Sequence, residues 1–306
     1  MKTGAFVLLI MGALVGFAVP VHAAELHVVT TTSDLASITG AIGGSRIEVV
    51  SLSKGYQNPH FVDAKPSYLL VMRKADLLVA VGMELEVGWL PALLQQCRNP
   101  KLLTPAHYLD ASATAKILEK PTYQVTRALG DVHPFGNPHY WLDPENGRAI
   151  ARAVEAKLVE LDPDGRSAYE ANLSAFESRL SLKEAEWRSS MGPYAGTKVI
   201  TYHNSWPNFL DYFGLVAAGY VEPRPGIPPS PSHTLDIINL ITAQQVPVIL
   251  VEPYFDTKTP DFIASKTGAK VLTFYPSVGG VPDIEDYIDL FDHDIKLLTA
   301  ALGGGR

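Results

Sequence analysis

The chain has 306 residues, a formal net charge of −7 at pH 7 and a single cysteine, Cys97. Its length is compatible with two domains of roughly 150 residues each, and its acidic balance lacks the basic face that phosphate binding requires, so nucleic acid is not an expected partner. One thiol can neither close an internal disulfide nor supply a thiolate zinc cluster, so any bound metal must be held by nitrogen and oxygen.

The chain begins with the pattern of an export signal. Lys2 is followed by an apolar run over residues 5–19, then by Pro20 and the small-residue pattern Val21-His22-Ala23. The run is shorter than the roughly 18 to 20 apolar residues that span a bilayer, and no cysteine lies near the cleavage point to carry a lipid. We therefore predict a signal peptide over residues 1–23 and export of the mature chain to the periplasm.

Short β-branched runs alternate with amphipathic stretches in the first part of the mature chain. We expect strands at residues 26–31, 47–52 and 77–81, and helices at residues 34–42, 66–74 and 87–96. The region from about 104 to 135 has no clear period and is expected to be mostly loop. Alternation of strand and helix predicts a parallel sheet with helices on its faces.

Two helices are predicted back to back in the middle of the chain. The first, over residues 144–161, opens with Asp143 as N-cap and Pro144 at the first helical position. The second, over residues 164–191, would be about 40 Å long at 1.5 Å per residue. It places apolar side chains near one face, namely Tyr169, Leu173, Phe176, Leu180 and Trp187. We interpret it as a rigid connector between two lobes; the alternative is an ordinary long surface helix.

The alternating pattern restarts after Gly192-Pro193. Strands are expected at residues 198–202, 215–221, 248–251 and 270–274, and helices at residues 205–213, 235–245, 260–267 and 284–298. The proline-rich stretch 223–231 should be a stiff extended loop. The fold class is thus α/β, with an N-terminal lobe at residues 24–163, the connecting helix at 164–191 and a C-terminal lobe at 192–306.

Three histidines lie where strands or helices should begin or end. His60 and His139 each close the tripeptide Asn-Pro-His, and His203 follows the first strand of the second lobe. In α/β folds the carboxyl ends of strands carry ligand-binding side chains. We interpret the three as one divalent-metal site in the cleft between the lobes, although each histidine alone is typical of a turn residue bonded to backbone.

Five motifs occur in order across nearly the whole mature chain: Thr31-Thr32-Ser33-Asp34-Leu35, Asn58-Pro59-His60, Asn137-Pro138-His139-Tyr140-Trp141-Leu142-Asp143-Pro144, Tyr202-His203-Asn204-Ser205-Trp206 and Pro229-Ser230-Pro231. Together they resemble the metal-binding receptors of bacterial zinc and manganese ABC importers, and the eight-residue motif is the most specific. The resemblance implies two lobes joined by a rigid helix, metal ligands at His60, His139 and His203, and delivery to a membrane permease driven by an ATPase. We expect a monomer, with a periplasmic metallochaperone as a candidate further partner.

The donor set favours zinc. Imidazole suits zinc, copper, nickel and iron, whereas manganese favours more oxygen ligands. In the family that the chain resembles, a carboxylate at the third ligand position goes with manganese, and here that position is His203. We therefore predict Zn2+ as the transported ligand.

The fourth ligand is not settled by the sequence. Many relatives carry an acid in the last strand-to-helix loop, but residues 275–280 contain none. Water or Asp283 is our first choice, ahead of Glu252, which could equally accept a hydrogen bond from a ligating imidazole.

The remaining histidines are expected to be structural. Zinc-importing relatives often carry a His-rich loop in the region of His133, but a single histidine is thin support for metal capture. We expect His133 to be an exposed loop residue. His27, His107, His233 and His293 have no motif around them.

Two other functions use the same residues. A secreted zinc hydrolase would need a general base, for which Glu252 or Asp283 could serve, but the chain contains no His-Glu-x-x-His element. A receptor for an organic solute would need a roomy, aromatic-lined cleft in place of a closed metal cage.

Overall fold

The computed structural model describes residues 26–126, 129–130 and 132–303 of the chain. The predicted leader, residues 1–23, lies outside the described residues. No helix of the described part is long and apolar enough to cross a bilayer.

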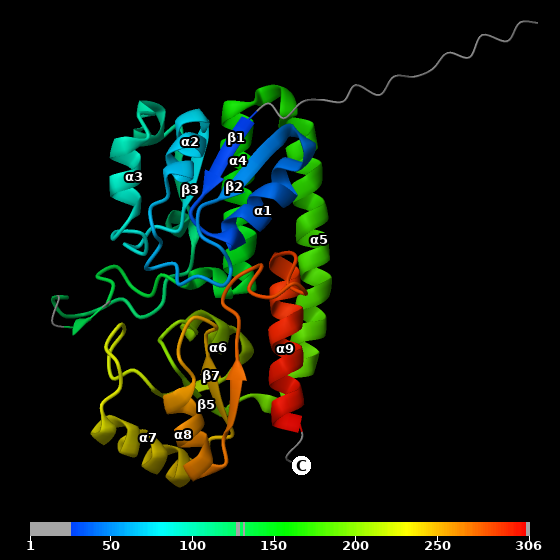
Figure 1. Cartoon of the computed structure of the whole chain (residues 1–306). Helices are drawn as coiled ribbons and strands as arrows, with labels where there is room; N and C mark the ends of the chain where they lie inside the picture. Colours follow the sequence, from blue (N-terminus) through cyan, green and yellow to red (C-terminus); the bar gives the residue numbers. More distant parts are fainter. Residues whose placement is uncertain (1–25, 127–128, 131, 304–306) are drawn as a thin grey trace, which may run out of the picture.

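Two four-stranded parallel sheets form two lobes that lie one above the other in Figure 1. The first has the order β2-β1-β3-β4 and the second the order β6-β5-β7-β8. The strands of the first lobe are β1 (Leu26–Thr30), β2 (Ile47–Ser51), β3 (Leu77–Ala80) and β4 (Tyr108–Asp110). Those of the second lobe are β5 (Lys198–Thr201), β6 (Val216–Tyr220), β7 (Val248–Val251) and β8 (Lys270–Thr273). The two lobes therefore repeat one topology, and the predicted α/β fold class is confirmed.

Helices cover both faces of each sheet. In the first lobe these are α1 (Ser33–Gly43), α2 (Pro66–Lys74), α3 (Leu90–Gln96) and α4 (Pro144–Leu161). In the second they are α6 (Pro207–Phe213), α7 (Pro231–Gln244), α8 (Lys258–Thr267) and α9 (Tyr287–Gly303). Buried side chains on the two faces of each sheet belong to different clusters: β1 and β3 bury alternate residues against α2 and α3 on one face, and against α1 and α4 on the other.

The predicted long helix is α5 (Arg166–Met191), with 26 residues. It runs along both lobes in Figure 1 and contacts α1 and α4 in one lobe and α9 in the other. It begins two residues later than expected, because Pro163–Gly165 form a short 3₁₀ turn before it. The helix therefore spans both lobes, as the connector interpretation requires.

A strand was missed in the region expected to be mostly loop. Tyr108–Asp110 forms β4, which pairs in parallel with β3 at the edge of the first sheet. Three residues are too few to show a period of two, so sequence periodicity does not reveal such a strand. The α7 helix also begins earlier than expected, at Pro231, since Ser230 accepts a hydrogen bond from the His233 N–H and caps it.

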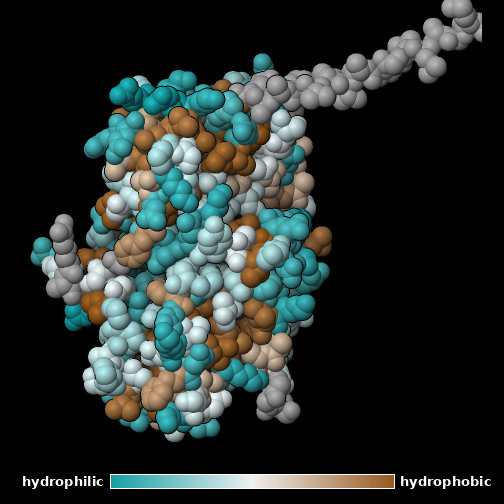
Figure 2. Space-filling view, in the orientation of Figure 1, coloured by the Kyte–Doolittle hydropathy of each residue, from teal (hydrophilic) through white to brown (hydrophobic). Residues whose placement is uncertain are grey.

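The outer surface is mixed in character. On the face drawn in Figure 2, hydrophilic residues are interspersed with separate hydrophobic patches. Exposed aromatic side chains include Phe61, Tyr123 and Phe135, which are more than half exposed.

Candidate metal site

The repeated tripeptide Asn-Pro-His builds the same turn twice. Asn58 Oδ1 accepts a hydrogen bond from the His60 N–H at 3.0 Å, and Asn137 Oδ1 accepts one from the His139 N–H at 3.0 Å. An asparagine that bonds the backbone two residues ahead fixes the chain in a tight turn. The first turn is also held by Trp89, whose Nε1 donates to the Pro59 carbonyl at 3.0 Å. Local sequence therefore fixes the backbone of two histidines.

His203 is positioned by the end of the central strand of the second sheet. It lies two residues after β5, and Thr201 Oγ1 donates to its carbonyl at 2.7 Å. Its Nδ1 lies 2.8 Å from Glu222 Oε2, and both side chains are buried. Glu222 follows β6, which pairs with β5, so the two residues share one edge of the sheet.

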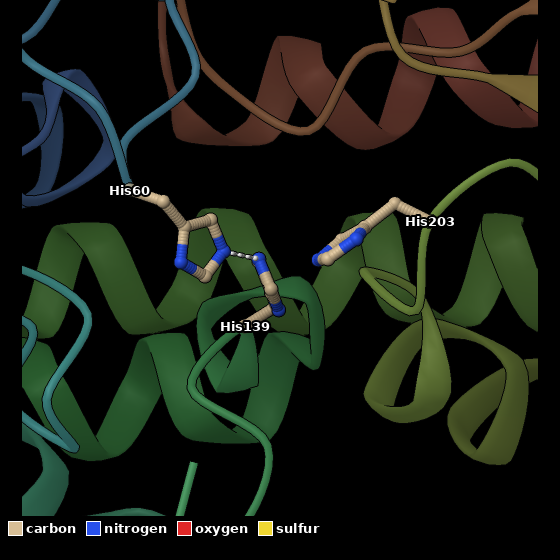
Figure 3. A group of neighbouring side chains, drawn as sticks. All are labelled: His60, His139 and His203. Carbon is tan, nitrogen blue, oxygen red and sulfur yellow. Dashed lines mark hydrogen bonds between the residues drawn. The ribbon is translucent and has the colours of Figure 1, made fainter. Parts of the chain in front are cut away.

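The structure brings the three predicted histidines together. One ring nitrogen from each of His60, His139 and His203 lies within 4.8 Å of the others. The rings point toward one another from three separate segments of the chain, and His60 Nε2 lies 3.1 Å from His139 Nε2 (Figure 3). All three side chains are buried, at 8, 2 and 6 % exposure. Since zinc bonds imidazole nitrogen at about 2.0 to 2.1 Å, only a small contraction would place one ion between them.

Burial keeps the imidazoles of His60 and His139 neutral. Loss of hydration lowers the pKa of both rings well below the usual 6.5, and the neighbouring histidines lower it further. A neutral imidazole is the form that binds a metal ion.

Hydrogen-bond partners set which nitrogen is free. The side-chain oxygen Oδ1 of Asn137 lies 3.0 Å from His139 Nδ1 and accepts a hydrogen bond from its N–H, and the Glu222 carboxylate accepts one from His203 Nδ1–H. Both rings therefore present Nε2 with its lone pair to the centre of the site. The 3.1 Å contact between His60 Nε2 and His139 Nε2 has a donor set by the tautomer of His60.

Glu222 was not anticipated from the sequence. The only signal in the sequence was an acidic residue at the carboxyl end of a predicted strand that was expected to lie beside the strand of His203.

The side-chain amide of Asn137 links the two lobes, because its Nδ2 donates to the Asn204 carbonyl at 2.8 Å, next to His203.

Neither proposed carboxylate joins the histidine group. Asp283 is exposed and lies near His293. Glu252 is fully buried, and its Oε1 accepts a hydrogen bond from Trp206 Nε1 at 3.0 Å. Burial raises the pKa of Glu252 to about 7. Asp143 caps α4 by accepting from the Glu145 N–H, as its sequence context predicts.

The expectation for His133 is wrong. It is partly buried, and its ring centroid lies 5.2 Å from that of His60. The four histidines predicted to be structural lie outside the group formed by His60, His139 and His203. Three of them have local partners: His27 bonds Glu48, His107 bonds the Asp76 carbonyl and His233 bonds the Tyr220 carbonyl.

Comparison with known proteins identifies the family. The family model described as "Zinc-uptake complex component A periplasmic" (ZnuA) matches residues 28–301. The chain belongs to the ZnuA family. Members of this family are metal-binding, substrate-binding proteins of ABC transporters, which work with a membrane permease and an ATPase.

Individual relatives of the ZnuA family match over most of their length. The manganese ABC transporter substrate-binding lipoprotein scaA of Streptococcus gordonii is 24% identical, covering 99% of both chains. The high-affinity zinc uptake system protein ZnuA of Yersinia pestis is 25% identical, covering 88% of this chain and 89% of its own. A crystal structure of ZnuA superimposes with a TM-score of 0.75 at 26% identity, covering 90% and 98% of the two chains. Relatives are thus named for different metals, and identity alone does not choose between them.

Proposed function

We propose that this protein is a periplasmic receptor that binds Zn2+ and delivers it to the permease of an ABC importer. The main support for this proposal is the group of three buried imidazoles, each of which has a ring nitrogen within 4.8 Å of the others. Two of them, His139 and His203, present Nε2 because their Nδ1 protons are bonded. His60, His139 and His203 are the proposed ligands.

The choice of zinc over manganese is supported by donor chemistry. Nitrogen ligands favour zinc, while manganese favours carboxylate, carbonyl and water oxygens. Among the described residues, no carboxylate joins the three imidazoles within the 4.8 Å group. Manganese remains the second candidate, since several similar proteins are named for that metal.

Binding rather than hydrolysis is supported by the family and by Glu252. A hydrolase needs a base beside a metal-bound water, and the most buried acid near His203 is Glu252. Glu252 lies outside the 4.8 Å group of imidazoles, and one of its oxygens is bonded by Trp206 Nε1.

A competition titration tests the proposal. Protein purified without added metal is analysed for its metal content, then titrated with zinc and manganese separately and together. We expect bound zinc and displacement of manganese by equimolar zinc. Preferential retention of manganese would overturn the choice of metal, and binding of neither would overturn the receptor function. Zinc-dependent turnover of esters, peptides or phosphates would favour the hydrolase instead.

The proposal includes a cleaved signal peptide over residues 1–23, lobes bounded at residues 163 and 192, and action as a monomer. It also includes a periplasmic metallochaperone as a candidate donor of the metal. These features remain predictions, each testable on the purified mature protein.

A further inference from the structure

His133 approaches the three proposed ligands from a fourth segment of the chain. Its ring centroid lies 5.2 Å from that of His60, compared with 5.1 Å between His60 and His139 and 5.5 Å between His60 and His203. His133 is therefore as close to His60 as the other two rings are, although only His60, His139 and His203 have nitrogens within 4.8 Å of one another.

The ring of His133 is held in the way a ligand would be. It is hydrogen-bonded to the backbone of Met83, while its Nε2 is buried and has no partner. A buried nitrogen without a hydrogen bond is costly to the fold and calls for an explanation such as a missing ion or water.

His133 lines two cavities beside the three histidines. An outer cavity of about 700 Å³ is lined by His60, Phe61 and His133. A small inner cavity of about 60 Å³ is lined by His133, His139 and His203. His133 therefore borders both spaces.

Neither carboxylate considered for the fourth position lines the small cavity beside the imidazoles. Asp283 is exposed. Glu252 accepts a hydrogen bond from Trp206 Nε1 through one oxygen, while its Oε2 has no partner among the described residues. Zinc in a closed site takes four ligands in a tetrahedron. The three proposed imidazoles leave one position, which a nearby unpaired nitrogen would fill.

We infer that His133 supplies the fourth nitrogen ligand through Nε2, giving the bound metal a tetrahedral set of four imidazoles. The inference rests on the proposed function. Coordination requires Nε2 of His133 to move toward the other three nitrogens, because it lies outside the 4.8 Å group. An all-imidazole set disfavours manganese more strongly than three imidazoles and an oxygen would.

The test compares the zinc-loaded protein with the His133→Ala variant by zinc-edge X-ray absorption and by chelator-competition titration. We expect four imidazoles in the wild type and three imidazoles with one oxygen in the variant. Loss of the ligand should lower zinc affinity at least about tenfold, the smaller end of what loss of an outer-shell partner costs. His293→Ala is the matched control, because His293 lies outside the group, and it should match the wild type.

Three imidazoles in the wild type, with unchanged zinc affinity in His133→Ala, would overturn the role of His133 and leave the proposed function intact. Melting of the metal-free variant is measured in parallel, so that a folding defect is recognised. The wild-type imidazole count then still decides the matter. Zinc binding that survives His203→Ala would instead overturn the proposed function.

Discussion

At the scale of single residues, the site depends on the partners of its imidazoles as much as on the imidazoles themselves. Asn58 and Asn137 each fix the turn that carries a histidine, and Asn137 also fixes the tautomer of His139. Glu222 does the same for His203. Such partners orient a ligand before the metal arrives, so less ordering is required on binding.

Replacing His203 by Ala should remove most of the zinc-induced rise in melting temperature. A metal that binds only the folded state stabilises it as its concentration exceeds the dissociation constant. We would measure melting of the metal-free and zinc-saturated forms of the wild type and of the variant, with His293→Ala as control. A zinc-induced shift as large as in the wild type would take His203 out of the site.

Replacing Glu222 by Ala should weaken zinc binding by about ten- to a hundredfold. The substitution removes the 2.8 Å hydrogen bond that orients the His203 ring. It also removes the carboxylate that makes His203 Nε2 a stronger electron-pair donor to a metal ion. Glu222→Gln keeps an acceptor and should fall between the two. Chelator-competition titrations rank the three proteins, and equal affinity of Glu222→Ala and wild type would contradict the role of Glu222.

The pH dependence of stability should change when Glu252 is replaced by Gln. Burial raises the folded-state pKa of Glu252 from 4.5 to about 7. As pH rises, the unfolded chain loses this proton before the folded protein does. The contribution of protonated Glu252 to the free energy of unfolding is therefore complete below pH 4.5 and is lost as pH rises through about 7. Glu252→Gln lacks this loss, so its stability relative to wild type should increase between pH 5 and pH 8, by up to about 3 kcal/mol.

Denaturant unfolding of both metal-free proteins at the two pH values provides the measurement. The buried histidines and the other buried acids titrate in both proteins, so their contributions cancel in the difference. A difference in stability that stays constant with pH would show that Glu252 is ionised throughout this range in the folded state.

At the scale of elements, local signals predicted much of the fold. The bounds of α2, α4 and β7 match the expected ranges, since proline at the start of each helix and an uninterrupted apolar run in the strand mark them. The short β4 was missed, because its pairing with β3 is a contact between distant segments. Glu222 and His133 were not placed beside the site for the same reason: Glu222 contacts His203, 19 residues away, and His133 contacts His60, which is farther away still along the chain.

Helix packing behind the site can be tested at Gly147 of α4. A Cβ at this position would collide with the ring of Tyr287 of α9, whose hydroxyl donates to the Trp141 carbonyl. Gly147→Ala should therefore destabilise the protein by about 1 to 3 kcal/mol, as overpacking does.

The matched control is Gly40→Ala in α1, where a Cβ would make only an ordinary contact with Val49 at 3.5 Å. There alanine should stabilise the helix by about 0.5 to 1 kcal/mol. Denaturant unfolding gives both values. Equal effects of the two substitutions would contradict the tight fit of Tyr287 against α4.

At the scale of the whole molecule, the two lobes share one hydrophobic core. A continuous cluster of buried side chains includes Leu77 of β3 in the first lobe and Leu250 of β7 in the second, together with residues of α5. Hydrogen bonds also cross between lobes: Trp141 Nε1 donates to the Pro276 carbonyl at 2.8 Å, and Ser33 Oγ donates to the Val278 carbonyl at 2.7 Å. The hydrophobic pattern of the sequence showed that each helix has an apolar face, but not which faces meet across the lobes.

This shared core predicts that metal loading leaves the arrangement of the lobes nearly unchanged. A wide hinge motion would expose apolar side chains of the common cluster to water and break the bonds that cross between lobes, and both changes cost free energy. Bonding to the metal requires only that imidazoles already within 4.8 Å approach one another. Small-angle X-ray scattering of the metal-free and zinc-loaded protein should therefore give radii of gyration that differ by less than about 1 Å, as in other pre-organised complexes. A decrease of several ångströms on loading would mean that the lobes separate in solution and that the common core does not hold them together.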